Sequence, residues 1–394
     1  MASVCLSFEV HQPARLRRYS VFDTDPSYFD NQANAGILKK VAESCYLPAV
    51  RRILDLVVRH DGRFRLAFSI SGTVIEQWRA HCPQLIELFG RLARSGCVEL
   101  LGETYHHSLA FFYSRAEFRA QVDLHARLME DLFGQVPRVF CHTELIYNND
   151  LSAFLRSMGQ HHGILTVGSD QFLGDRRVDH PYHPPGAANL NLLLRNNDLS
   201  DDVSKRFSDR TWARWPLDAE KFAQCIDRIN ANGHLCNLFM DFESFGEHHS
   251  SDTGILDFLN QLPESILTVG GGSNDFKTPS ECIAAYEPAG EFDVPHIISR
   301  ADPERDLSNW LGNAMQSNAL HELYKLEQPV KDSGDPQLLD DWRNLTSADH
   351  FYYMCTKYFA ADRASKTFNP YESPYDSYIN FMNVLDNVRS RTER

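Results

Sequence analysis

The sequence predicts an α/β protein: an incomplete parallel (β/α)7 barrel followed by a C-terminal helical domain. Short apolar runs alternate with amphipathic helical segments about seven times before residue 290, as is typical of parallel strands joined by helical crossovers. After about residue 300 the pattern is helical only. We therefore expect a barrel domain over residues 1–290 and a helical domain over 291–394 that helps to form the cleft.

Each barrel unit is expected from an apolar run and the helical periodicity that follows it. The expected strands are 4–10, 64–70, 98–101, 136–140, 162–167, 190–194 and 235–242. The expected helices between and after them are about 36–59, 83–93, 114–133, a helix starting at 149, 218–231 and 253–262. Ser114 and Glu117 form a capping-box pattern at the start of the longest helix. Beyond the barrel we expect helices over 302–327, 336–359 and 374–388.

Composition excludes two classes of partner. The chain has 394 residues, is 43% hydrophobic and carries a formal net charge of −14. This acidic balance, without a basic stripe, disfavours nucleic-acid binding. No apolar run reaches the roughly 18 residues that a membrane span needs, so no membrane association is expected.

Cysteine usage points to a reducing compartment. The nine cysteines are an odd number, lie scattered along the chain and form no CxxC pair. The N-terminus has no basic leader and is typical of a first strand rather than a signal peptide. We expect a cytoplasmic protein; nothing in the sequence indicates an oligomeric state.

Acids and histidines follow the expected strands where each strand ends. They are His11, Glu103, His107, Glu144, Asp241 and Glu243. Any one of them is explained equally well as a helix cap. As a group they point to the C-terminal rim of a parallel barrel, where such folds build their active sites.

Two of these strand-end acids predict a chemistry. Glu144 lies in an apolar setting, between Phe140 and Leu145, where an ionisable group without a role would be costly. Strand alternation places Asp241 and Glu243 on one side of the seventh strand. Two carboxylates at two strand ends are the minimum equipment for hydrolysing a glycosidic bond. From the residues alone, the second carboxylate is either Asp241 or Glu243.

A metal site is not expected, and no cofactor is indicated. The histidines occur in pairs, but adjacent histidines on a strand face opposite ways, and no HExxH motif is present. Trp212, Trp215 and Trp310 are candidates for stacking on sugar rings, with core packing as the alternative. For Trp310 the core alternative is strong, because it belongs to a helical apolar stripe with Leu307 and Leu311.

Five stretches in a fixed order carry a family resemblance. They are HQP at 11–13, GCVELLGETYHHSL at 96–109, CHTELIYNND at 141–150, FMDFESFGEHH at 239–249 and ERDLSNWLGNAMQ at 304–316. The set resembles glycoside hydrolase family 57, within it the α-amylase-like group, and the resemblance covers nearly the whole chain.

The resemblance implies roles for individual residues. It implies that Glu144 is the nucleophile and that Asp241, rather than Glu243, is the acid/base. It implies substrate-binding positions at His11, Gln12, His107, Glu243, Asp306 and Trp310. The implied activity is that of a retaining, α-amylase-like glycoside hydrolase cleaving α-1,4-glucan such as glycogen, starch or maltodextrin.

Other functions remain open at this point. A 4-α-glucanotransferase would act on the same substrates through the same intermediate. Related barrels also host metal-dependent polysaccharide deacetylases, and a non-catalytic protein would bind glucan without turning it over. The retaining mechanism predicts carboxyl groups of Glu144 and Asp241 about 5–6 Å apart. Two carboxylates that close cannot both ionise cheaply, so Asp241 is expected to keep its proton at neutral pH.

Overall fold

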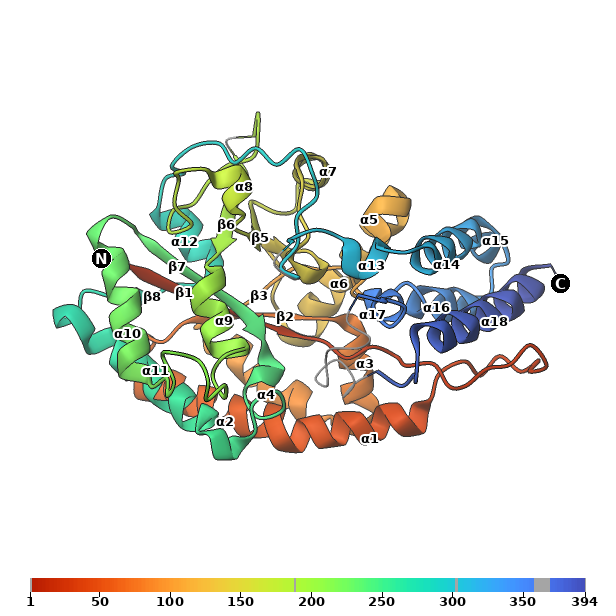
Figure 1. Cartoon of the computed structure of the whole chain (residues 1–394), viewed down its shortest axis with the longest axis horizontal. Helices are drawn as coiled ribbons and strands as arrows, with labels where there is room; N and C mark the ends of the chain where they lie inside the picture. The colour runs from red at the N-terminus through yellow and green to blue at the C-terminus, as the bar shows by residue number, and fades with distance from the viewer. Residues whose placement is uncertain (1, 188, 302–303, 358–368, 394) are drawn as a thin grey trace.

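Helices surround a core of parallel strands in the computed structural model, and a second group of helices lies beside them (Figure 1). The structure describes residues 2–187, 189–301, 304–357 and 369–393. The strands are β1 (Ser3–Val10), β2 (Leu66–Ile70), β3 (Val98–Leu100), β4 (Val139–Cys141), β5 (Gly163–Val167), β6 (Asn191–Arg195), β7 (Leu235–Asp241) and β8 (Asp275–Phe276).

Seven of these strands form the predicted incomplete barrel. One ladder has the order β3-β2-β1-β7 and the other β4-β5-β6, and every pairing is parallel. A bridge between Gly102 and Phe140 joins β3 to β4, and the Asn196 amide donates to the Asn237 carbonyl at 2.7 Å to join β6 to β7. The two ladders therefore meet at seams where only a few backbone hydrogen bonds connect the described residues, among them Gly102 N–H to the Val139 carbonyl and Cys141 N–H to the Gly102 carbonyl. The short β8 pairs with the start of β1.

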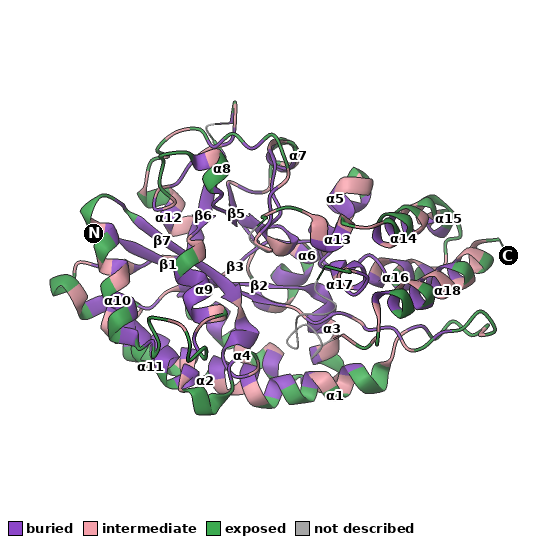
Figure 2. Cartoon of the chain, in the orientation of Figure 1, coloured by how far each residue is buried: buried purple, intermediate pink, exposed green. Residues whose placement is uncertain are grey.

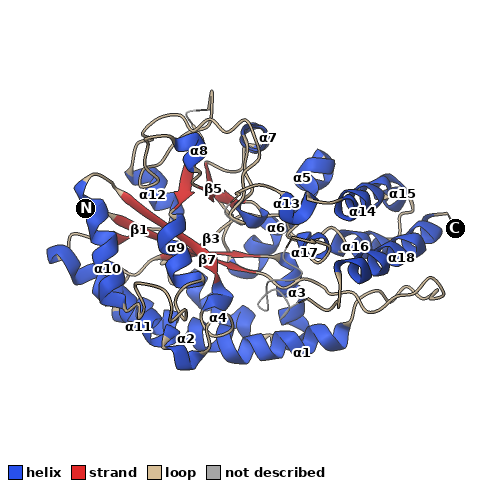
Figure 3. Ribbon diagram, in the orientation of Figure 1, coloured by secondary structure: helices blue, strands red, loops and turns tan. Residues whose placement is uncertain are grey.

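Helices follow the strands, as the alternating pattern predicts (Figure 3). They are α1 (Asn31–Val41), α2 (Leu47–Arg59), α3 (Gly72–His81), α4 (Gln84–Arg94), α5 (Ala110–Tyr113), α6 (Arg115–Phe133), α7 (Asn149–Met158), α8 (Asp170–Leu173), α9 (Asn197–Ser204), α10 (Ala219–Asp227), α11 (Ile255–Thr268) and α12 (Pro279–Ala285). The expected capping at α6 is present, since the Ser114 side chain accepts from the Glu117 amide. The expected helix 36–59 begins earlier, at Asn31, because the Asp30 side chain caps it, and a π-helical turn separates α1 from α2.

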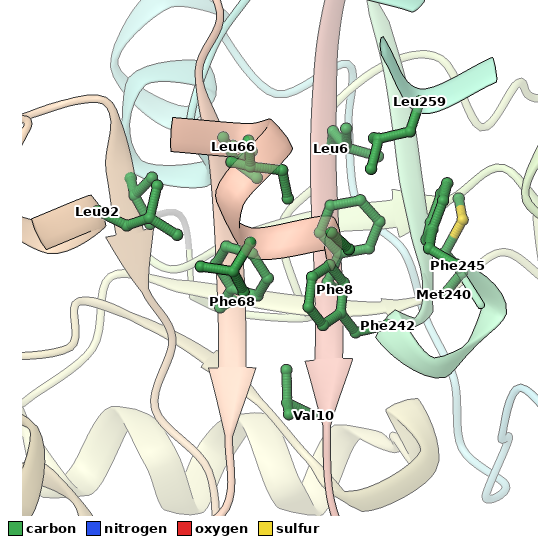
Figure 4. Packing of buried hydrophobic residues seen from close by; sticks show 14 of the residues in the cluster. Leu6, Phe8, Val10, Leu66, Phe68, Leu92, Met240, Phe242, Phe245 and Leu259 are labelled. Carbon is green, nitrogen blue, oxygen red and sulfur yellow. The ribbon is translucent and has the colours of Figure 1, made fainter. Parts of the chain in front are cut away.

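Strand alternation divides the barrel core in two. Phe8, Phe68 and Phe242 belong to the cluster between the strands and the helices outside them, and their rings lie 5.3–5.5 Å apart (Figure 4). Cys5 and Phe239 face the other way and pack with residues of β4–β6. Glu9 follows Cys5 at a spacing of four residues, so its side chain points into the barrel.

Within the described residues, six helices follow the barrel units where the sequence predicts three. They are α13 (Ser308–Leu311), α14 (Ala314–Lys325), α15 (Glu327–Asp332), α16 (Pro336–Asn344), α17 (Ala348–Tyr352) and α18 (Pro374–Thr392). The single helix expected over 302–327 is wrong because Asn313 caps a new helix, α14, through a capping box. The expected start at 302 and the expected end at 359 lie outside the described residues.

The helical region is tied to the barrel by its own core and by buried charge. Its apolar cluster includes Leu16, Tyr19 and Tyr28, which come from the segment after β1. Figure 2 shows that the barrel strands are largely buried, whereas the outer helices carry many exposed residues. The fully buried Glu117 of α6 pairs with Lys331 at 2.8 Å and with Arg343 at 2.8 Å. Because N-terminal residues belong to the helical core, the division at residue 290 remains a prediction. Across the described ranges, no helix combines the length and the apolar character that crossing a bilayer requires.

Candidate active site

A cavity of about 280 Å³ opens at the carboxyl ends of the barrel strands. Residues from the strand ends, from the segment after α12 and from α13 and α17 line it, and these two helices lie beside the barrel in Figure 1. The lining residues are Glu9, His11, Gln12, Pro13, Arg15, His107, Glu144, Asp241, Glu243, His248, Arg300, Trp310, Ala348, Asp349, Tyr352 and Tyr353. The sequence-predicted strand-end residues therefore meet in one cavity, except Glu103, which lies behind it.

Glu144 is presented by a strained turn after β4. Its backbone has φ 57° and ψ 27°, and Leu145 has φ 53°, both left-handed values that non-glycine residues rarely adopt. The Arg300 amide donates to the Glu144 carbonyl at 2.9 Å, and Thr166 Oγ1 donates to the Leu145 carbonyl at 3.1 Å. Strain of this kind costs about 1–3 kcal/mol per residue and gathers at functional sites.

Asp241 is presented by regular strand geometry. It is the last residue of β7 and lies opposite Glu9 in the β1–β7 register. Because register partners in a parallel pair point to the same face, Glu9 and Asp241 lie together inside the barrel mouth. The Asp241 side chain is 33% exposed and the Glu9 side chain 6% exposed, so Glu9 forms the deeper part of the site.

Arg300 joins these carboxylates. Its Nε donates to Glu144 Oε2 at 2.8 Å, and its Nη2 donates to Asp241 Oδ1 at 2.6 Å and to Glu9 Oε2 at 2.7 Å. Glu144 and Asp241 thus accept from neighbouring nitrogens of one guanidinium, so their carboxylate groups lie close to each other. The exact separation of about 5–6 Å remains a prediction.

The guanidinium changes the expected protonation of the pair. Burial is the largest single influence and raises the pKa of Asp241, but Arg300, His248 and Arg195 together outweigh burial and bring this pKa down to about 2. Burial also opposes ionisation of Glu144, whose pKa Arg300 and His107 lower below its usual value. The expectation that Asp241 keeps its proton at neutral pH is therefore wrong for this arrangement, because a cation between the two acids removes their repulsion.

His107 and His11 form a stacked pair at the side of the cavity. Their rings lie 4.2 Å apart. His107, whose backbone φ is 52°, has Nδ1 3.6 Å from Glu9 Oε1 and 3.4 Å from Glu103 Oε2. Burial lowers the pKa of His107, but the surrounding carboxylates raise it well above its ordinary value. His11 Nε2 lies 2.9 Å from Asp349 Oδ2 of α17, so the helical region positions this ring.

Glu243 lies behind Asp241 rather than beside Glu144. Its Oε1 accepts from the Tyr46 hydroxyl and, at 3.5 Å, from Gln12 Nε2. Burial, then the charge of Asp241, raises the pKa of Glu243 to about 8. A buried, protonated Glu243 that is held by Tyr46 and Gln12 supports the wall of the cavity.

The remaining sequence candidates differ in position. Trp310 is 2% exposed, lines the cavity and also packs in the helical core. Asp306 is not among the cavity-lining residues; its Oδ1 accepts from the Ser308 amide at 2.8 Å, just before α13. Trp212 packs against the barrel core and Trp215 is 42% exposed, and neither lines the cavity.

Sequence reasoning missed Glu9, Arg300 and Asp349. Glu9 carried a usable signal, since it is the one acid in the otherwise uncharged strand SVCLSFEV. Arg300 and Asp349 carried none, because they reach the site from a loop and from a short helix of another region.

One cluster of ligand-type atoms meets the spacing of a cation site. Single atoms from Glu9, His107 and Glu144 lie within 4.8 Å of one another. Arg300 already donates to both carboxylates. The raised pKa of His107 favours the imidazolium, which cannot ligate a metal. Protein groups therefore supply the positive charge in this cluster.

Comparison with known proteins agrees with this geometry. The family model described as glycosyl hydrolase family 57 matches residues 5–295. A Methanocaldococcus jannaschii protein named "Putative alpha-amylase" is 34% identical over 396 residues, covering 97% of this chain and 83% of that protein.

Solved structures show the same fold at low sequence identity. A branching enzyme from Thermococcus kodakaraensis superimposes with a TM-score of 0.71 at 13% identity, covering 99% of this chain and 94% of its own. A 4-alpha-glucanotransferase from Thermococcus litoralis gives a TM-score of 0.62 at 14% identity, and 97% of this chain spans 59% of it. By the match of its family model over most of its length, the chain belongs to glycosyl hydrolase family 57.

Proposed function

We propose that this protein is a retaining, α-amylase-like glycoside hydrolase. One observation carries the proposal: Glu144 and Asp241 face one cavity and are held by neighbouring nitrogens of Arg300. Retaining glycosidases place their two carboxyl groups about 5–5.5 Å apart, whereas inverting enzymes leave about 6.5–9.5 Å for a water. A shared guanidinium favours the shorter spacing.

The reaction then proceeds in two displacements. Ionised Glu144 attacks the anomeric carbon and forms an ester bond, the glycosidic C–O bond breaks, and the leaving oxygen takes a proton from Asp241. In the second step Asp241 takes a proton from water as the water oxygen attacks the anomeric carbon, which breaks the ester and frees Glu144. Arg300 and His107 favour the ionised form of Glu144 that the first step needs.

The proposed substrate is α-1,4-glucan, such as glycogen, starch or maltodextrin. The name of the M. jannaschii relative supports this choice. The cavity supports a sugar substrate as well, because Trp310, Tyr352 and Tyr353 supply aromatic surface beside polar groups that can bind hydroxyls. His11, Gln12, His107 and Glu243 are the proposed polar contacts.

Transfer to a second sugar is the alternative outcome of the same intermediate. The likeness to a 4-alpha-glucanotransferase in fold favours keeping this candidate. The two activities differ only in whether water or a sugar hydroxyl attacks the ester. A cytoplasmic location also stays a prediction; the nine cysteines, all within the described residues, form no disulfide with one another.

Incubation with maltoheptaose tests the proposal. We expect shorter maltodextrins, and proton NMR of the first products should show the α anomer, which retention requires. Products longer than maltoheptaose would assign the transferase instead. Glu144→Gln is the matched control and should yield neither. Maltoheptaose that binds but stays intact after long incubation with the wild-type protein would contradict both enzyme proposals.

A further inference from the structure

Glu9 and Asp241 share one nitrogen of Arg300. They are register partners on β1 and β7, and Nη2 donates to Glu9 Oε2 at 2.7 Å and to Asp241 Oδ1 at 2.6 Å. Nη2 has one N–H bond for each carboxylate. Two ionised carboxylates this close are still unfavourable, since the single charge of Arg300 also serves Glu144. One proton shared between Glu9 and Asp241 relieves this conflict.

Burial decides which of the two carries the proton in this structure. The Glu9 side chain is 6% exposed and that of Asp241 is 33% exposed. Burial raises the pKa of Glu9 to about 8 against the lowering effects of Arg300 and His107. The pKa of Asp241 is about 2, because Arg300, His248 and Arg195 together outweigh burial there. At neutral pH the proton therefore resides on Glu9.

Catalysis needs the opposite distribution. Asp241 must be protonated to assist departure of the leaving oxygen. We propose, on the basis of the glycosidase function above, that Glu9 is the proton store for Asp241 and that Arg300 is the positioning residue that links them. When a glucan binds, the O–H bond of Glu9 breaks, an O–H bond forms on Asp241, and Nη2 stays with the newly ionised Glu9.

This exchange leaves the rest of the site unchanged. The net charge of Glu9, Asp241 and Arg300 is the same before and after it. Nε of Arg300 keeps its bond to Glu144 Oε2 throughout, so the nucleophile stays ionised and in place. Asp241 Oδ1 is released, and its exposed side chain turns toward the sugar oxygen.

Other ionisable groups face the pair from the elements around it. They are His107 after β3, Glu144 after β4, Arg195 at the end of β6, and Glu243 and His248 after β7. His107 lowers the pKa of Glu9 and of Glu144, while His248 and Arg195 lower the pKa of Asp241. Nη2 of Arg300 donates to Glu9 and to Asp241, and this shared nitrogen distinguishes the pair.

Two substitutions should move the pH dependence in opposite directions. In Glu9→Gln, residue 9 can no longer supply a proton, and Asp241 is then the one ionisable group of the pair that accepts from Nη2. The pKa of Asp241 therefore remains low in the complex with glucan. We expect the alkaline limb of kcat/KM for maltoheptaose to move to lower pH by about one unit or more. In Arg300→Gln the cation is lost, the pKa of Asp241 rises, and the alkaline limb should move to higher pH by a similar amount.

Matched variants separate this role from a structural one. Arg300→Lys keeps the positive charge, so the alkaline limb of its pH profile should lie at lower pH than that of Arg300→Gln. Glu99→Gln removes another largely buried barrel carboxylate, which bonds Ser280 away from the cavity, and should move neither limb. The proposal would be overturned if Glu9→Gln and Arg300→Gln lost activity equally while the alkaline limbs of their pH profiles stayed at the wild-type position.

A readout without turnover keeps the test independent of the proposed function. In protein carrying ¹³C-labelled carboxyl groups, NMR titration should show the pKa of Glu9 falling in Asp241→Asn, because Arg300 then serves Glu9 and Glu144 alone. An unchanged Glu9 titration would overturn the shared proton. If the wild-type protein shows no glucan activity while the pKa of Glu9 still falls in Asp241→Asn, this result counts against the glycosidase function only.

Discussion

The two sides of the candidate active site are built in different ways. On the β1–β7 side, Glu9 and Asp241 occupy paired positions of a regular parallel ladder. On the opposite side, Glu144 lies in a left-handed turn, and Arg300 is held against it by a backbone bond at 2.9 Å. The regular side is positioned by the barrel itself. The irregular side depends on the chain after α12 staying in place against the turn.

This difference matches the demands on each carboxylate. A nucleophile must attack along one line, and a strained turn that neighbouring bonds over-determine fixes its direction. A proton carrier must change partners, and a strand-end side chain with solvent access has that freedom. In the proposed mechanism, the Glu144 side is therefore the rigid half of the site, and the Asp241 side is the half that changes its protonation.

The largest effect should come from breaking the irregular side. Glu144→Gln keeps the shape of the side chain but removes the nucleophile, so we expect activity on maltoheptaose to fall by about 10⁴-fold or more. A substrate with fluoride as leaving group should be equally inert. Initial-rate assays with both substrates check this, and substantial turnover of either would remove Glu144 from the nucleophile role.

The next effect concerns the regular side. Asp241→Asn should slow cleavage of maltoheptaose by about 10²–10⁴-fold, because the leaving oxygen receives no proton. A maltosyl fluoride should be spared in the first step, since fluoride leaves unprotonated, and azide should restore turnover by attacking the ester without a base.

Glu243→Gln is the matched control for Asp241→Asn. Glu243 is held by Tyr46 and Gln12, away from Arg300. We expect Glu243→Gln to weaken maltoheptaose binding more than it slows the chemical step. Its turnover of maltosyl fluoride should not be preserved relative to its turnover of maltoheptaose. A reversal of the two phenotypes would make Glu243 the acid.

What the sequence predicts follows the same division of the site. Glu144, Asp241, His11 and His107 are predictable because they follow apolar strands, and the parallel barrel brings strand ends together. Arg300 is not predictable in this way, since the loop that carries it has no periodicity. The protonation of Asp241 was predicted wrongly for the same reason, because that argument counted the two acids without the cation between them.

The helical region offers a smaller effect, on stability. Glu117 is fully buried on α6 and pairs with Lys331 and Arg343, which links the barrel to α15 and α16. Glu117→Gln leaves Arg343 without this acid and Lys331 with Glu327 alone, and we expect the free energy of unfolding to fall by about 3 kcal/mol. Urea denaturation measures it. Asp386→Asn, which breaks a pair of exposed groups with Arg389, should cost less than about 0.5 kcal/mol.

The smallest effect should follow chelation. The metal-dependent deacetylase alternative requires a divalent cation, and the atoms of Glu9, His107 and Glu144 that lie within 4.8 Å of one another are where it would bind. Arg300 donates to both carboxylates of this cluster, and the raised pKa of His107 favours its cationic form. A divalent ion would have to displace the guanidinium of Arg300 and deprotonate the imidazolium of His107.

We therefore expect glucan cleavage to survive exhaustive dialysis against EDTA unchanged, with no gain when Zn²⁺ or Mg²⁺ is restored. Glu9→Gln offers a second check, since it should alter the pH profile equally with and without EDTA. Activity that EDTA abolishes and Zn²⁺ restores would place a metal between the two sides of the site and remove Arg300 from its proposed role.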